Sequence, residues 1–447
     1  MEYMTTAEAA KLLGISVQRI RQLAAAGTIT GQRMGGQWLL DRDSVHALAC
    51  KPVRKGGRPR IGAGAADRPF TLMNRTHAVC DIVYHSKRKE FIQVGEILDS
   101  HRLPIGLFGS DRRTRVHAFN AWWKGRGIPG DRRGLQKLLD DAGAEVPEEL
   151  LMRNLGLSLS DQYWIRPVGS QLQWESINFF DNDFLELDER AIRPPLDDIS
   201  QAHPDNTSDG NLAKHWVLRG RKRVLLKEGA KLNQEPFNEL VATRLHQRLI
   251  QEGEYVPYWI EGVGAEAVSA CACFLTDEEE YVPAWYVDRI LPERDSRDAY
   301  RHYVACCELL GIEGIERALS KMIVCDDILA NDDRHYRNFG IIRNVETLAC
   351  RPAPLFDSGS SLWVNSTLSD LRSGEFSYRS RPFDPRPARQ MMLVEDLSWL
   401  DTGGLDGFVD EAMAILGQNP LLKDRMAFIR QALQRRVERM IDIRAWW

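Results

Sequence analysis

One stretch of the sequence divides the chain. Residues 51–68 read KPVRKGGRPRIGAGAADR and are rich in glycine, proline, alanine and arginine, with almost no side chain that a core could bury. This composition is typical of a flexible linker, which we place at residues 51–70. We therefore expect a small N-terminal module at residues 1–50 and a much larger body. The 447 residues, 43% of them hydrophobic, are enough for about three domain-sized units.

Charge is unevenly distributed along the chain. The formal net charge is −4, yet residues 1–60 contain 10 Lys or Arg and only 4 Asp or Glu, so the remainder is acidic overall. A contact with nucleic acid is accordingly expected at the N-terminus. The 8 cysteines form no C-x-x-C pair, the first residues do not resemble a signal peptide, and no stretch has the ~18 apolar residues that cross a membrane. We expect a cytoplasmic protein with reduced thiols, associated with the nucleoid when bound to DNA.

The N-terminal module opens with a helix start signal. Thr5 precedes Glu8 by three residues, the spacing of a capping box, and the helix that follows is expected to bury Ala9, Leu12 and Leu13. A second helix follows, and then TITGQRMGGQWLL reads as a two-stranded wing. Helix, turn, helix and hairpin is the order of a winged helix-turn-helix domain, whose second helix enters a DNA major groove. Over residues 3–49 the sequence resembles excisionase-type and MerR-type domains.

Polar side chains on the second helix point away from its apolar face, which consists of Val17, Ile20, Leu23 and Ala24. Glutamine and arginine can make paired hydrogen bonds to purine edges. The candidate DNA contacts are Gln18, Arg19, Arg21 and Gln22 on the helix, Arg33 in the wing, and Arg58 and Arg60 in the basic tail. Gly57-Arg58-Pro59 also matches the centre of an AT-hook. The alternative is a small helical interaction domain with a solvated polar face. A homodimer is expected, because such modules usually read two half-sites.

Residues 71–198 are expected to form a middle domain that is helical and rich in aromatic residues. Tyr163 and Trp164, within LSLSDQYWIRP, are expected to pack in a core rather than to form a ligand cage. This zone contains no catalytic constellation. Its expected role is to recognise a partner or to brace the domain that follows.

A turn of small residues follows the polar break at 199–210. Residues 207–211 read TSDGN and could expose backbone N–H groups to phosphate oxygens. Ser208, Gly210 and Asn211 are therefore candidate nucleotide contacts, although the same turn could simply join two strands.

A lysine and a glutamate next to this turn can form a pair. Lys227 closes the apolar strand 224–226, where a buried ammonium needs an anionic partner. Glu239 lies near the start of a helix that opens at Pro236 and could supply that partner, as in the Lys–Glu pair of protein kinases. The alternatives are an exposed lysine at a strand end and a glutamate that complements the helix dipole.

The strongest signal is DDILANDDRHYRNFGIIRN followed by APLFDSGSSLW. An apolar helix leads into a loop that holds Asp333 and, five residues later, Asn338, and Asp357 follows about 19 residues further on. Phosphoryl transfer uses one carboxylate to accept the proton of the attacking hydroxyl, and an amide and a second carboxylate to hold Mg²⁺ through hard oxygen ligands. The order and spacing indicate a kinase catalytic loop and metal loop.

With these elements, residues ~200–445 resemble the HipA-like family of bacterial serine/threonine kinases. The motifs that carry this resemblance are NDDRHYRNFGI, PLFDSG and QEPFNEL. The resemblance implies ATP and Mg²⁺ as cofactors. It implies that Asp333 is the catalytic base, that Asn338 and Asp357 are the Mg²⁺ ligands, and that Lys227, paired with Glu239, binds nucleotide. Further nucleotide contacts are implied for His335 in the loop and for Phe274 and Leu275 in the interlobe hinge. Ser208 is a candidate autophosphorylation site.

The expected fold is therefore α+β, a two-lobed protein-kinase-like body preceded by a small winged helix-turn-helix domain. The kinase core is expected at 199–447, with the small lobe at 199–275 and the large helical lobe at 276–447. The expected function is an ATP- and Mg²⁺-dependent serine/threonine kinase tethered to DNA, in a toxin–antitoxin or defence system or acting on its own promoter. The sequence does not identify the protein substrate.

Two alternatives stay open. A lipid or small-molecule kinase would use Arg334, Arg337 and Arg351 for an anionic substrate, although the same arginines could brace the loop. A DNA-binding transcription regulator could use the kinase fold only as a nucleotide sensor, but a pure sensor needs no catalytic base such as Asp333.

Overall fold

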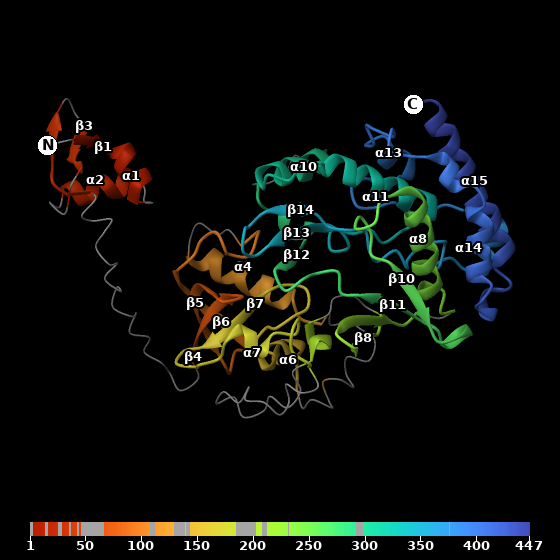
Figure 1. Cartoon of the computed structure of the whole chain (residues 1–447), viewed down its shortest axis with the longest axis horizontal. Coiled ribbons are helices and arrows are strands. Elements are labelled where there is room, and N and C mark those ends of the chain that lie inside the picture. The colour runs from red at the N-terminus through yellow and green to blue at the C-terminus, as the bar shows by residue number, and fades with distance from the viewer. Residues whose placement is uncertain are drawn as a thin grey trace. The chain divides into compact units, whose positions relative to one another are not determined.

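The computed structural model describes residues 3–13, 17–25, 29–34, 37–42, 44–45, 67–107, 112–128, 139, 144–184, 203–207, 212–230, 232–291, 298–374 and 376–447. The chain separates into two compact units, Met1–Ala65 and Ala66–Trp447 (Figure 1). This boundary falls within the expected linker. The second unit begins earlier than expected, because residues from Asp67 onward already pair in a sheet.

The N-terminal unit contains two helices and a small antiparallel sheet. Its elements are β1 (Tyr3–Thr5), α1 (Thr6–Leu13), α2 (Val17–Ala25), β2 (Gly31–Met34) and β3 (Gln37–Asp41), with strand order β1-β3-β2. The expected wing is the β2–β3 hairpin, and the short strand β1 is an addition that the sequence did not indicate.

Local signals and burial in this unit agree with the expected helices. The Thr5 backbone N–H donates to Glu8 Oε2 (2.7 Å) and the Glu8 N–H donates to Thr5 Oγ1 (3.3 Å), which is the reciprocal pattern of a capping box. Ile20 and Ala24 are buried in the small core. Leu12 is an exception, because it is 44% exposed and not buried as expected.

The middle zone is built on a sheet, so the expectation of a helical domain was wrong. Four antiparallel strands in the order β6-β5-β4-β7 form it: β4 (Asp67–Asn74), β5 (His77–His85), β6 (Glu90–Ile97) and β7 (Tyr163–Pro167). The helices α4 (Arg112–Lys124), α6 (Pro147–Arg153) and α7 (Trp174–Ile177) accompany it. Tyr163 and Trp164 are buried in the aromatic-rich core of this sheet, as expected.

The next part is a second antiparallel sheet with one long helix, the small lobe. It contains β8 (Lys214–Arg219), β9 (Lys222–Lys227), α8 (Glu235–Leu249), β10 (Tyr258–Glu261) and β11 (Val268–Ala272), with strand order β10-β11-β9-β8. Two 3₁₀ helices, η1 (Pro204–Thr207) and η2 (Gly264–Glu266), flank these strands. The small-residue turn is thus preceded by a 3₁₀ helix and not by the expected strand.

The remaining residues form a mainly helical large lobe. A three-stranded sheet, β12 (Glu279–Pro283), β13 (Gly340–Asn344) and β14 (Cys350–Pro352), adjoins the helices. These are α9 (Ala284–Val287), α10 (Ala299–Leu309), α11 (Ile315–Leu329), α12 (Leu368–Ser373), α13 (Pro387–Met391), η3 (Thr402–Leu405), α14 (Phe408–Leu416), η4 (Pro420–Leu422) and α15 (Met426–Ala445). The C-terminal helix α15 buries Ile429, Leu433, Val437 and Met440 along one side.

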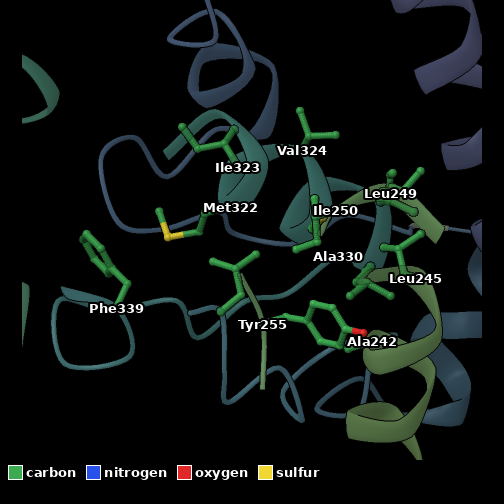
Figure 2. Close-up of a cluster of buried hydrophobic side chains, with 14 of the residues drawn as sticks. Ala242, Leu245, Leu249, Ile250, Tyr255, Met322, Ile323, Val324, Ala330 and Phe339 are labelled. Carbon is green, nitrogen blue, oxygen red and sulfur yellow. The ribbon is translucent and has the colours of Figure 1, made fainter. Parts of the chain in front are cut away.

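One hydrophobic core joins the two lobes. Figure 2 shows part of this buried cluster, to which Leu245 and Leu249 of α8 and Met322 and Val324 of α11 all belong. Burial of this apolar face fixes α8 and α11 to each other, and with them the two lobes. The α+β class expected from the sequence is confirmed. Among the described residues, none of the helices combines the length and the apolar character needed to span a membrane.

The middle sheet is fastened to the large lobe by buried polar groups. Glu280 of β12 accepts hydrogen bonds from Asn74 of β4 (3.2 Å) and Arg343 of β13 (2.7 Å). Arg343 also donates to the hydroxyl of Tyr163 in β7 (2.5 Å). Burial raises the pKa of Glu280 even though Arg343 opposes the shift. These contacts place the middle domain and the two lobes in one compact unit.

Candidate active site

A buried lysine at the end of β9 forms two ion pairs. The Lys227 ammonium donates to Glu239 Oε1 of α8 (2.5 Å) and to Asp357 Oδ1. Lys227 and Glu239 are 3% and 2% exposed, which excludes the reading of an exposed strand-end lysine. Desolvation lowers the pKa of Lys227, but Asp357 and Glu239 outweigh it and hold this pKa well above its usual range. Lys227 is therefore a fixed positive charge on the small-lobe side of the site.

The loop that carries Asp357 is held by α8. The Ser358 N–H donates to Glu239 Oε2 (2.9 Å), and Asn238 Nδ2 donates to the carbonyls of Gly359 and Ser361, each at 2.8 Å. Asp357 itself has a left-handed backbone (φ 57°), a conformation that costs free energy in a non-glycine residue and that its surroundings must enforce. Desolvation would raise its pKa, but Lys227 and Lys214 lower it well below the usual range, so the carboxylate is ionised.

Asp333 and Asn338 lie in the loop between α11 and β13. Asn338 Nδ2 donates to the Asp333 carbonyl (3.0 Å), and the Asp333 N–H donates to Asn331 Oδ1 (3.1 Å). The Asp333 carboxylate is 44% exposed and stands 3.3 Å from Arg381 and 4.0 Å from His335. Desolvation raises its pKa, and His335 and Arg381 partly offset that effect. A carboxylate with a raised pKa that reaches solvent suits a general base.

Arg334 connects the loop that carries Asp333 and Asn338 to the loop that carries Asp357. Its side chain is fully buried, and it pairs with Asp326 of α11 through Nε–Oδ2 (2.8 Å) and Nη2–Oδ1 (3.0 Å). It also donates to the carbonyls of Asn338 (2.9 Å) and Phe356 and to Ser358 Oγ (3.0 Å). Arg334 therefore braces the loops and does not face a substrate, a distinction that the sequence left open.

These side chains border a single cleft of about 960 Å³ between the lobes. Of the residues singled out from the sequence, the cleft is lined by Tyr163, Lys227, Phe274, Leu275, Asp333, His335, Arg337, Asn338 and Asp357. Glu239 stands behind Lys227 as its partner. The Phe274 ring stacks on Phe356 at 5.5 Å, where the chain passes from β11 to β12. A cleft of this size, with apolar walls at one end and charges at the other, can hold a nucleotide.

The middle domain supplies one wall of this cleft. Residues 122 and 124–127, at the end of α4, and 158–161, before β7, line it. Arg337, in the loop between α11 and β13, donates to the Gly125 carbonyl (3.3 Å), which connects that wall to the loop. No signal in the sequence indicated this contribution, because the residues are far from the motifs along the chain.

Ser208, Gly210 and Asn211 lie outside the described residues. The segments on either side are fastened together by Asp205 of η1. One carboxylate oxygen of Asp205 contacts His215 Nδ1 and the other accepts from the Trp216 N–H (2.6 Å). The rings of His203 and His215 stack at 5.3 Å. Thr207 and Leu212, which flank the turn, both line the cleft.

The candidate DNA contacts are only partly described. The backbones of Gln18, Arg19 and Gln22 lie in α2 and that of Arg33 lies in β2, but their side chains are outside the described part. Arg21 is exposed on α2. Arg58 and Arg60 lie outside the described residues altogether.

Comparisons with known proteins identify the N-terminal part. Residues 3–51 match the family described as a helix-turn-helix domain, which confirms the expectation for this module. No match was found among curated proteins.

Two solved structures share a distant likeness with the chain. A Helicobacter pylori proinflammatory kinase, CtkA, aligns with a TM-score of 0.39 and 16% identity over 52% of this chain and 92% of its own. A chain from the Shewanella oneidensis MR-1 toxin–antitoxin complex of HipA, HipB and operator DNA aligns with a TM-score of 0.47 and 14% identity over 83% of this chain and 97% of its own. The chain thus carries an N-terminal domain of the helix-turn-helix family, followed by an α+β body with its own charged cleft.

Proposed function

We propose that the body is an ATP- and Mg²⁺-dependent serine/threonine protein kinase of the HipA-like type, joined in one chain to a DNA-binding domain. The observation that carries this proposal is the position of Lys227, which pairs with both Glu239 and Asp357 at a cleft that Asp333 and Asn338 also line. A lysine held by a helix glutamate, a base and two oxygen ligands are the parts that phosphoryl transfer requires.

The side chains present fit a magnesium nucleotide. Asp357 offers a carboxylate with a lowered pKa. Asn338 commits its amide nitrogen to the Asp333 carbonyl, which leaves its oxygen as the atom that could meet a cation. Hard oxygen donors of this kind suit Mg²⁺. Bound Mg²⁺ and ATP would supply a charge-neutralised phosphoryl group for transfer.

The chain's own residues then have separate tasks. Lys227 would hold a phosphate of the nucleotide, while Glu239 keeps the ammonium in place. Asp333 would accept the proton of the attacking hydroxyl. Phe274 and Leu275 would cover the base of the nucleotide, and Arg334 keeps the two loops in register.

The structure weakens the support for a lipid or small-molecule substrate. Of the three arginines that could have bound an anionic substrate, Arg334 is buried in the ion pair with Asp326. Arg351 pairs with Glu279 at 2.8 Å. Arg337 donates to a backbone carbonyl of the cleft wall, although it also lines the cleft and is the one of the three that an anionic substrate there could still meet. Because the DNA-binding domain and the proposed kinase share one chain, we extend the proposal to action at the promoter of its own operon or in a toxin–antitoxin system.

The test is intact-mass spectrometry of the purified protein after incubation with ATP and Mg²⁺, beside Asp333→Asn as a matched control. We expect the wild type to gain phosphate and the variant to gain none, with equal thermal stability showing that the variant is folded. Peptide mapping would then show whether Ser208 is the acceptor. Absence of phosphate transfer to itself and to added proteins, with nucleotide-dependent DNA binding intact, would favour the nucleotide-sensing regulator instead.

A further inference from the structure

An arginine-rich segment lies at the candidate base. Residues 376–389 follow α12 and run into the first turn of α13, and they contain Arg379, Arg381, Arg386 and Arg389 and a single acidic residue, Asp384, which pairs with Arg386. All four arginines are exposed. Arg381 Nη1 is 3.3 Å from Asp333 Oδ1, which places the segment directly at the proposed site of phosphate transfer. A positive patch at this point is unexpected on a body whose sequence is acidic overall.

Hydrogen bonds from buried side chains fix the backbone of the arginine-rich segment. Gln390, 3% exposed, accepts from the N–H groups of Phe383 (3.1 Å) and Asp384 (3.2 Å) and donates to the Arg381 carbonyl. Ser380 Oγ donates to the Asp384 carbonyl (2.7 Å). These bonds fix the backbone on both sides of Arg381, so its guanidinium is presented without a large ordering cost on binding.

Aromatic packing fixes the arginine-rich segment to the large lobe. The Phe383 ring contacts four aromatic rings, with centroid distances of 5.2 to 6.3 Å. They belong to Tyr300, Tyr303, Tyr336 and Phe339. Two of these rings lie in the loop of Asp333 itself. Arg381 therefore lines the cleft from the large-lobe side, whereas Lys227, the proposed nucleotide lysine, lies in the small-lobe sheet.

The pair between Arg381 and Asp333 can exchange partners. Both side chains are nearly half exposed, at 46% and 44%, and ion pairs of this kind are weak. A carboxylate of an incoming chain could bind the guanidinium in the two-pronged manner that arginine favours. Asp333 would then be released to meet the hydroxyl, so recognition and activation of the base would be linked.

We propose that this segment is the docking site for the phosphate acceptor, and that the acceptor is an acidic peptide segment with carboxylates next to its serine or threonine. This inference rests on the proposed function, since it names the substrate class of that site. The arginine-rich segment recognises the acceptor through charge, with Arg381 nearest to the reacting hydroxyl and Arg379 further along the chain.

The test is a binding measurement, which does not require phosphate transfer. Two fluorescein-labelled heptapeptides with a central serine, one flanked by glutamates and one by lysines, are titrated with the full-length protein in the presence of Mg²⁺ and a non-hydrolysable ATP analogue. Fluorescence polarisation should give about tenfold tighter binding of the acidic peptide, weakened by salt. Equal affinities, or tighter binding of the basic peptide, would overturn the proposal.

Variants locate the binding. Arg379→Glu and Arg381→Glu should each weaken binding of the acidic peptide about three- to tenfold. Arg381→Lys should weaken it less than Arg381→Glu, because lysine keeps the positive charge but cannot make the two-pronged contact. Arg88→Glu is the control, because Arg88 is an exposed arginine in the turn between β5 and β6 and does not line the cleft. An equal loss of peptide affinity in the control would refute this location. It would also be refuted if Arg379→Glu and Arg381→Glu weakened the binding of a labelled DNA duplex but not the binding of the peptide. Failure of the kinase proposal would instead be seen as absent phosphate gain by mass.

Discussion

Replacing Arg334 should destabilise the body more than any substitution of an exposed arginine. Arg334→Met keeps much of the side-chain length but leaves the Asp326 carboxylate buried without its cation, and it leaves the carbonyls of Asn338 and Phe356 without this donor. Breaking a buried ion pair by removing one partner costs about 3–5 kcal/mol. Because domains are stable by only about 5–15 kcal/mol, the loss is a large fraction of the total.

The assay is urea unfolding followed by circular dichroism, with Arg351→Met as the matched control. Arg351 pairs with Glu279 at 2.8 Å but is 50% exposed, so its loss should cost about 0–1 kcal/mol. The double variant Asp326→Asn with Arg334→Met should be less destabilised than the sum of the two single variants, since the unpaired charge is gone. If Arg334→Met costs no more than the control, or if the two substitutions add, the argument that Arg334 is held by a buried pair is wrong.

Three further outcomes are expected. Burial and the charge of Arg334 lower the pKa of His246 to about 3 from 6.5, so below pH 6.5 the unfolded state binds a proton that the folded state does not. The free energy of unfolding should therefore fall by about 2 kcal/mol from pH 7 to pH 5. Urea titrations of His246→Gln should lack this part of the pH dependence. Gly340→Ala should lower the melting temperature in calorimetry, because its Cβ would lie 2.2 Å from the Val282 carbonyl oxygen. Overpacking of this kind costs about 1–3 kcal/mol. An unchanged melting temperature would show that β12 shifts to make room for the methyl group. Ile20→Asp should abolish binding to a DNA duplex without reducing the phosphate gain measured by mass, because Ile20 is buried in the separate N-terminal core; a loss of both would contradict that independence.

Local sequence signals predicted local structure well. The capping box at Thr5, the apolar face of α2, the β9 strand that ends at Lys227 and the helix that leads to Asp333 each depend on neighbours within a few residues along the chain. Such patterns can be read from the sequence because the forces that set them act over one or two turns.

Expectations about the middle zone failed for the opposite reason. The zone was expected to be helical, but it is built on four strands, some of which pair with segments far away along the chain, as β4 does with β7. The burial that selects a strand there depends on the opposite face of the sheet. No pattern within a few residues along the chain predicts this burial.

The sequence by itself determined which residue types the site contains and their order along the chain: Lys227, Glu239, Asp333, Asn338 and Asp357. The sequence also indicated Glu239 as a partner for Lys227, but only the tertiary structure showed that Asp357 is a second partner, because ion pairs depend on distance and burial and not on spacing. The tertiary structure also buries Arg334, which braces the loop, and leaves Arg381 exposed beside Asp333, although both arginines lie near the same loop.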